Sequence, residues 1–175
     1  MAAELTPGDI VERGTYLGAG VGGGAYSIEW GGTAYVAKQW GHPDSVAGQW
    51  HAYQPRQLEL QAIKQFAVQN ALAVAGIPAP VSAILVSDPT WVLMEKVEGL
   101  DLLQLSQEER AQAVAAQEAL ERQAEPVILA TLDELKQQHP DGELCFRYAP
   151  DISSNSRFAR TPTGIQLVGV FDPVI

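Results

Sequence analysis

The spacing of apolar positions along the chain predicts three β-hairpins. Each consists of two short alternating or β-branched runs on either side of a turn signal, the pattern of adjacent antiparallel strands. The first turn is the dipeptide Gly31-Gly32, which matches the two-residue loops of tight hairpins. The predicted strand pairs are residues 26–30 with 33–37, 81–86 with 91–97, and 156–159 with 166–171.

A long helix is predicted between the first two hairpins. Residues 56–75 contain no helix breaker, and apolar side chains recur among them at helical spacing. The helix ends before residues 76–80, Gly-Ile-Pro-Ala-Pro, because proline cannot continue a helix.

Two further helices are predicted before the last hairpin. Ser106 and Glu109 form a capping box, which opens a polar helix that runs to about Ala124. Pro126 suits the first turn of the next helix, which ends near His139-Pro140. The order strands, helix, strands, helices, hairpin is that of an α+β fold.

Composition and charge narrow the range of partners. The chain has 175 residues, 46% of them hydrophobic and 18% charged, which is typical of a globular protein with one domain or two small lobes. Its net charge of −10 repels nucleic-acid phosphates and anionic membranes, so neither is an expected partner. The single cysteine, Cys145, excludes an internal disulfide and suits a reducing compartment. With no apolar run of membrane-spanning length and no signal-peptide pattern, we expect a cytosolic protein. We also expect a monomer.

A glycine-rich segment, Gly18-Ala19-Gly20-Val21-Gly22-Gly23, matches the pattern G-x-G-x-x-G. Glycine lets backbone N–H groups approach phosphate oxygens because no side chain intervenes. Gly18, Gly20, Gly22 and Gly23 are therefore candidate nucleotide contacts. In a dinucleotide-binding fold this motif opens a helix, whereas here a strand follows it. The alternative to a phosphate site is a flexible glycine turn.

Lys38 ends the first predicted hairpin, 15 residues after Gly23. The strand Tyr35-Val36-Ala37-Lys38 resembles the V-A-I-K strand of protein kinases, and this implies that Lys38 holds the α- and β-phosphates of ATP. In that family a carboxylate on the next helix orients the lysine. The predicted helix contains a single acid, Glu59, which we expect to fill this role. The alternative is a solvated surface glutamate.

Residues 91–99, Trp-Val-Leu-Met-Glu-Lys-Val-Glu-Gly, resemble the strand and hinge that join the two lobes of a kinase. In that family, hinge backbone groups hydrogen-bond the adenine and a bulky residue lines the pocket. The resemblance implies that Met94 lines the adenine pocket while Glu95 and Val97 offer backbone groups. An ordinary buried strand would carry the same side chains.

The segment Tyr148-Ala149-Pro150-Asp151-Ile152-Ser153-Ser154-Asn155 resembles the kinase catalytic loop H-R-D-x-x-x-x-N, with Ala-Pro replacing His-Arg and a spacing one residue shorter. This implies that Asp151 accepts the proton of the substrate hydroxyl and that Asn155 binds a divalent metal ion. Asp172, which ends the last predicted strand, resembles the D-F-G aspartate and is the second predicted Mg²⁺ ligand. An alternative catalytic aspartate occurs in His139-Pro140-Asp141, but it opens a turn and lacks a following asparagine.

Together these motifs resemble the protein-kinase-like superfamily over residues 16–175. The resemblance implies a two-lobed α+β fold, with an antiparallel-sheet lobe and one helix in residues 1–97 and a strongly reduced helical lobe in residues 98–175. It also implies an ATP- and Mg²⁺-dependent enzyme that transfers the γ-phosphoryl group to a serine or threonine hydroxyl. The alternatives are a pseudokinase that serves as a binding module and a small-molecule phosphotransferase.

The very small size, the Pro-Asp-Ile-Ser-Ser-Asn loop and the early end of the sequence after Asp172 are similar to the HopBF family of minimal bacterial type III effector kinases. That resemblance implies a protein substrate in a eukaryotic host, the ninety-kilodalton heat-shock chaperone. It implies a location in the bacterial cytoplasm before secretion and in the host cytosol afterwards. Because the sequence has no activation segment after Asp172, we expect an enzyme that needs no prior phosphorylation.

Overall fold

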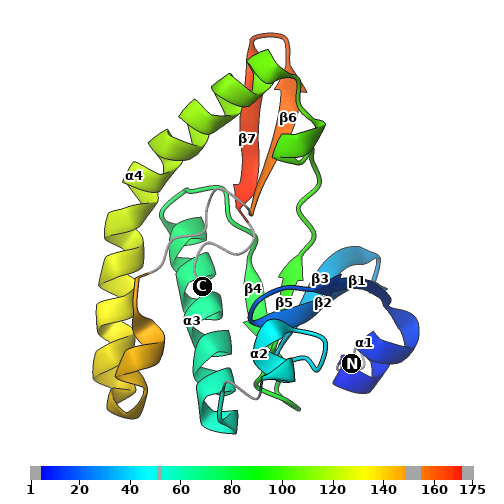
Figure 1. Ribbon diagram of the computed structural model, residues 1–175, viewed down its shortest axis with the longest axis vertical. Coiled ribbons are helices and arrows are strands. Elements are labelled where there is room, and N and C mark those ends of the chain that lie inside the picture. The colour runs from blue at the N-terminus through cyan, green and yellow to red at the C-terminus, as the bar shows by residue number, and fades with distance from the viewer. Residues whose placement is uncertain (1–4, 51–52, 149–154, 171–175) are drawn as a thin grey trace.

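A five-stranded antiparallel sheet forms one side of the molecule (Figure 1), in a computed structural model that describes residues 5–50, 53–148 and 155–170. The strand order is β1-β2-β3-β5-β4. The turn between β2 and β3 is Gly31-Gly32, as predicted, and both glycines have positive φ angles, 59° and 82°, which glycine adopts without steric cost. The strands are β1 Thr15–Ala19, β2 Gly23–Trp30, β3 Thr33–Trp40, β4 Ser82–Ile84 and β5 Trp91–Glu95.

The two faces of this sheet are covered by different helices. On one face, Ile10 of helix α1, Pro7–Arg13, packs with Ala37 and Trp91. On the other face, Ala62 of helix α3, Pro55–Val74, packs with Trp40 and neighbouring strand residues. Because successive strand residues point to opposite faces, Lys38 and Trp40 share the α3 face of β3. Helix α3 lies where the sequence predicts it, whereas α1 and β1 were not predicted.

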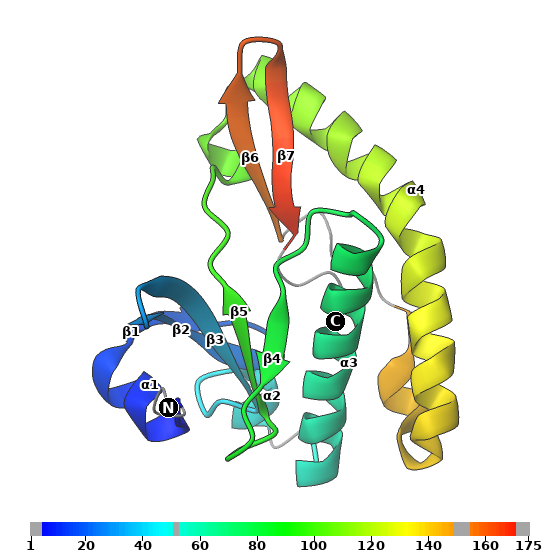
Figure 2. The same cartoon turned by 180° about the vertical axis from the view of Figure 1, so that it is seen from behind.

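Helix α4, Gln107–Gln138, and the 3₁₀ helix that follows it pack beside α3, on the side away from the sheet (Figures 1 and 2). Helix α4 lies alongside α3, and the 3₁₀ helix η2, Pro140–Phe146, folds back between them. The buried side chains of this core include Leu60, Ile128, Leu132, Phe146 and Val170. None of the helices in the described part of the chain is long and apolar enough to span a membrane.

The hairpin of β6, Ser156–Thr161, and β7, Gly164–Val170, is attached near the first turns of α4 (Figure 2). Arg160 of β6 forms an ion pair with Glu109, 2.6 Å between Nε and Oε1. Hydrogen bonds from Arg160 and from the Ser106 backbone lower the pKa of Glu109 to about 2. This hairpin was predicted, and so was the capping box of Ser106 and Glu109, which is present at the start of α4. The short helices α2, Val46–Gln49, and η1, Leu102–Gln104, complete the described elements.

Helix α4 is continuous, and this corrects the prediction of two helices separated near Pro126. The proline lies inside the helix with its side chain exposed. Its ring removes one backbone hydrogen bond, but the buried stripe of Ala124, Ile128 and Leu132 continues past it. Packing of this stripe against α3 and β7 therefore outweighs the local preference of proline for a helix start.

Replacing Pro126 by alanine is expected to stabilise the protein. Alanine restores the missing donor and fits the helix, and proline in a helix interior costs roughly 3 kcal/mol relative to alanine. Since α4 already accommodates the ring, we expect the free energy of unfolding in urea to rise by about 1–2 kcal/mol. Pro140→Ala, at the first position of η2 where no donor is lost, should give no comparable gain. A Pro126→Ala variant that is less stable than the native chain would contradict this account of α4.

Candidate functional site

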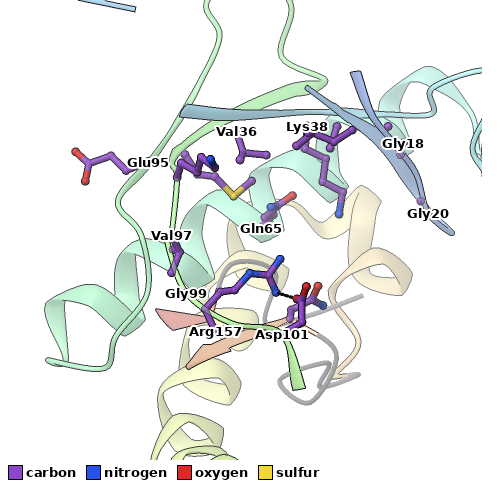
Figure 3. Close-up of a pocket in the computed structure, with 18 of the residues that line it drawn as sticks. Gly18, Gly20, Val36, Lys38, Gln65, Glu95, Val97, Gly99, Asp101 and Arg157 are labelled. Carbon is purple, nitrogen blue, oxygen red and sulfur yellow. Dashed lines mark ion pairs between the residues drawn. The ribbon is translucent and has the colours of Figure 1, made fainter. Parts of the chain in front are cut away.

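A cavity of about 590 Å³ lies between the α3 face of the sheet and a wall formed by residues 97–104, Asn155 and Arg157 (Figure 3). Its walls come from the glycine segment, strands β2 and β3, the end of β5, helix α3, and residues 97–104 and 155–157. The predicted site residues that line it are Gly18, Gly20, Gly22, Gly23, Lys38, Met94, Glu95, Val97 and Asn155.

The glycines of the glycine segment differ in how strictly the fold requires them. A Cβ would meet no atom within 4 Å at either Gly18 or Gly20, but Gly18 has a φ of 126°, which favours glycine, whereas Gly20 has room for a side chain. A Cβ at Gly22 would lie 2.4 Å from the ring of Trp40, and one at Gly23 would lie 2.3 Å from the Gln39 carbonyl oxygen. Gly22 and Gly23 are therefore needed so that the segment can pack onto β3, in addition to any role towards a ligand.

The backbone of the glycine segment is held by α2 on one side. The N–H groups of Val46 and Ala47 donate to the carbonyl oxygens of Gly20 and Val21, at 3.2 and 2.8 Å. The N–H groups of Val21 and Gly22 have no acceptor among the described residues. Consecutive N–H groups in a turn form a concavity that binds anions, so this loop has donors available for phosphate oxygens.

Lys38 lies on β3 and projects towards the cavity (Figure 3). Its ammonium nitrogen lies 4.0 Å from the centroid of the Trp40 ring, a distance at which a cation is attracted to an aromatic face. The side chain of Trp40 is buried and also lines the cavity.

Glu59 does not reach Lys38, which corrects the predicted pairing. Its carboxylate forms an ion pair with Arg56, 3.2 Å from Nη1 to Oε2, and it does not line the cavity. The residues of α3 that face the sheet follow the helical stripe Leu58, Ala62, Gln65. Each helical residue turns the side-chain direction by about 100°, so Glu59 is rotated away from this stripe even though it follows Leu58 directly.

The α3 side chain that does reach the cavity is Gln65. It is fully buried, and its Oε1 accepts a hydrogen bond from the indole N–H of Trp40 at 3.1 Å. Its Nε2 has no hydrogen-bond partner among the described residues. A buried donor without an acceptor is costly, so an acceptor group supplied by a ligand in this cavity would be favoured.

The end of β5 offers backbone groups at the cavity edge. The N–H groups of Glu95 and Lys96 donate to Val81 and Ala34, at 3.4 and 2.9 Å, whereas the N–H of Val97 has no acceptor among the described residues. Met94 is buried on the cavity wall, and the Glu95 carboxylate points away from the cavity (Figure 3). Only the backbone of Glu95 is therefore placed to contact a ligand.

The wall opposite Lys38 carries charged and polar groups. Asn155 precedes β6 directly, and Arg157, two residues later, forms an ion pair with Asp101 (Figure 3). The close approach of this wall requires Gly99, since a Cβ there would lie 3.0 Å from the Cβ of Arg157. Lys38 and Arg157 thus lie on opposite walls of one cavity, and the charge of Arg157 is paired with that of Asp101.

The remaining predicted aspartates lie elsewhere or outside the described residues. Asp141, the alternative catalytic residue, pairs with Arg56 at 3.0 Å and does not line the cavity. That guanidinium lowers the pKa of the Asp141 carboxyl. Asp151 and Asp172 fall outside the described residues.

Sequence reasoning missed several cavity residues, among them Trp40, Gln65 and Arg157. Trp40 was detectable because it follows Lys38 by two residues on one strand and so shares its face. Gln65 belongs to a run of glutamines at positions 57, 61, 65 and 69, an unusual polar stripe at helical spacing. Arg157 carried no comparable signal, because its approach to Gly99 depends on the folded chain.

No protein-family model matches the chain, and no curated protein matches it. Among solved structures, the chain is similar to the Rio2 kinase of Chaetomium thermophilum, solved as an ADP/Mg²⁺–phosphoaspartate complex, with a TM-score of 0.52 over 98% of this chain. The fold resembles that of a protein kinase. The sequence identity to Rio2 kinase is 18%, so this likeness concerns the fold alone, and the chain spans about half (48%) of the length of that kinase. The predicted kinase-like mixed fold with an antiparallel sheet is confirmed.

Proposed function

We propose that the chain is a protein kinase that transfers the γ-phosphoryl group of ATP, with Mg²⁺, to a serine or threonine hydroxyl. One observation carries the proposal. On a kinase-like fold, a single cavity gathers the glycine segment, Lys38, the N–H of Val97 and Asn155. In this proposal residues 1–97 form the sheet lobe and residues 98–175 the reduced helical lobe, with the nucleotide between them.

The cavity suits a nucleoside triphosphate in size and chemistry. Its volume, about 590 Å³, lies within the range of small-molecule sites. The backbone carbonyl of Glu95 and the N–H of Val97 would hydrogen-bond the base, with Met94 on the pocket wall. Lys38 and the N–H groups of Val21 and Gly22 would hold phosphate oxygens, and these donors offset the repulsion expected from a net charge of −10.

Asn155 and Asp172 would hold the Mg²⁺ ion. Amide and carboxylate oxygens suit this ion, which needs only one or two carboxylates together with substrate phosphates. Asn155 lines the cavity, as this role requires. When bound, the ion would neutralise charge on the phosphates.

The transfer itself asks the chain for positioning and charge stabilisation. Asp151 would accept the proton of the acceptor hydroxyl as its oxygen bonds to the γ-phosphorus. The bond from that phosphorus to the bridging oxygen breaks, and ADP leaves. Lys38 would hold the phosphate chain so that the attacking and leaving oxygens stay in line, and the residues around Lys38 would fix the position of its ammonium group.

The acceptor we propose is a host protein, in line with the resemblance to effector kinases, and the ninety-kilodalton heat-shock chaperone is the first to test. The enzyme would act in the host cytosol as a monomer. The second candidate is a pseudokinase, favoured by the altered catalytic loop, in which Ala149-Pro150 replaces the usual His-Arg pair.

The proposal is tested by incubating the purified chain with Mg²⁺, radiolabelled ATP, and the chaperone or a host lysate. We expect label on a protein substrate or on the chain itself, and its loss in Asp172→Ala, while Asp133→Ala on the exposed part of α4 keeps it. Nucleotide binding without transfer would favour the pseudokinase. If the chain shows no nucleotide binding and no transfer of label, the proposed function is refuted.

A further inference from the structure

We propose that Trp40 and Gln65 form the device that positions Lys38, in place of a helix carboxylate. This inference rests on the proposed function, because the position of Lys38 affects ligand binding only if the cavity holds a phosphate group. The device consists of a strand tryptophan whose ring face supports the ammonium and a helix glutamine that fixes the ring. Both are positioning residues, since they act on the nucleotide through Lys38.

The first step is the contact between Lys38 and Trp40. The two side chains lie on the same face of β3, and the Lys38 ammonium is 4.0 Å from the centroid of the indole ring. Trp40 is only 3% exposed, so its ring is held by the core and cannot follow a mobile lysine. Tryptophan is the best aromatic partner for a cation, and the attraction grows when the pair is desolvated.

The second step is the anchoring of the ring. The indole N–H donates to Oε1 of Gln65 at 3.1 Å, and both residues are buried. The ring also lies against Gly22, where a Cβ would come within 2.4 Å of it. The tryptophan therefore contacts the glycine segment, Lys38 and α3 at once, which links the three parts of the cavity that would hold phosphate.

The third step is the choice of a neutral side chain on α3. The only acid of that helix, Glu59, is paired with Arg56. Gln65 accepts from Trp40 with its oxygen and retains a buried Nε2 donor that has no partner among the described residues. A glutamate at position 65 would accept the same indole hydrogen bond but would lose this donor. The arrangement thus suits an anionic ligand, which would accept from Nε2.

The test measures the positioning of Lys38 without nucleotide, by the rate at which an amine-acylating reagent labels each lysine in the folded chain. Removing the ring in Trp40→Leu is expected to speed labelling of Lys38 by about three- to tenfold, the range that a cation–aromatic contact supports. Lys136 on α4 serves as the internal reference. Trp91→Leu is the matched control, because Trp91 is equally buried on the opposite face of the same sheet and should leave Lys38 labelling unchanged.

A second variant tests the role of position 65. In Trp40→Leu with Gln65→Glu, a carboxylate facing the cavity is expected to pair with Lys38 and return its labelling rate towards that of the native chain. Circular dichroism confirms that each variant is folded. Should Trp40→Leu fail to fold, Trp40→Phe keeps a ring but no N–H and should label Lys38 about twofold faster. Unchanged Lys38 labelling in the folded tryptophan variant, or no recovery in the double variant, would overturn the inference.

Binding of Mg²⁺-ATP, measured by calorimetry on the same variants, separates this inference from the proposed function. We expect about tenfold weaker binding in Trp40→Leu and partial recovery in the double variant. If the native chain binds no ATP, the proposed function fails, while the labelling rates still decide whether Trp40 and Gln65 position Lys38.

Discussion

Replacing Lys38 by methionine is expected to weaken Mg²⁺-ATP binding by roughly 30- to 150-fold and to reduce phosphoryl transfer to background. A hydrogen bond from a charged donor is worth about 2–3 kcal/mol, and this ammonium projects into the cavity beside the glycine segment. Methionine is an unbranched apolar side chain of similar length, so the loss reports the charge and its donors. Calorimetry and transfer of radiolabel measure the two effects.

The matched control for this substitution is Lys136→Met. Lys136 is paired with Asp133 at 2.9 Å near the end of α4, away from the cavity. Each of the two substitutions removes one positive charge from the protein, so any general electrostatic effect appears in both variants. Native-like binding by Lys38→Met, with Lys136→Met also unchanged, would show that Lys38 does not hold the ligand.

Phe158→Ala is expected to lower the free energy of unfolding by about 3–5 kcal/mol, a large part of the stability of a small protein. Phe158 is fully buried and packs with Leu105 and Ala113. Its backbone exchanges two hydrogen bonds with Leu100, at 2.8 and 3.0 Å, which join β6 to the segment after β5. The ring therefore supports the cavity wall that carries Arg157.

Urea denaturation followed by circular dichroism measures this loss. Leu103→Ala is the control, because Leu103 is in the neighbouring η1 but is 83% exposed and should change stability by less than about 0.5 kcal/mol. Equal effects from the two substitutions would contradict the packing described for β6. A partly folded Phe158→Ala chain should also bind Mg²⁺-ATP poorly, since the wall opposite Lys38 would no longer be fixed.

Short-range patterns determined most of the elements. The Gly31-Gly32 turn predicts its hairpin because positive φ angles at both positions favour that loop. The uninterrupted spacing of residues 56–75 predicts α3, and the Ser106 and Glu109 capping box predicts the start of α4. Lys38 was found from the resemblance of the strand Tyr35-Val36-Ala37-Lys38 to a kinase motif, which is also a short-range pattern.

Tertiary packing decided what local pattern leaves open. Pro126 favours a helix start by local preference, yet α4 runs through it because the buried stripe of α4 packs against α3 and β7. The side chain of α3 that faces the cavity depends on how the helix is rotated against the sheet, which contacts between distant segments determine. Thus the sequence alone determined the three hairpins, helix α3 and the place of Lys38 on β3. Only the folded chain decided that Gln65, and not Glu59, lines the same cavity as Lys38, because each step along a helix turns the side-chain direction by about 100°.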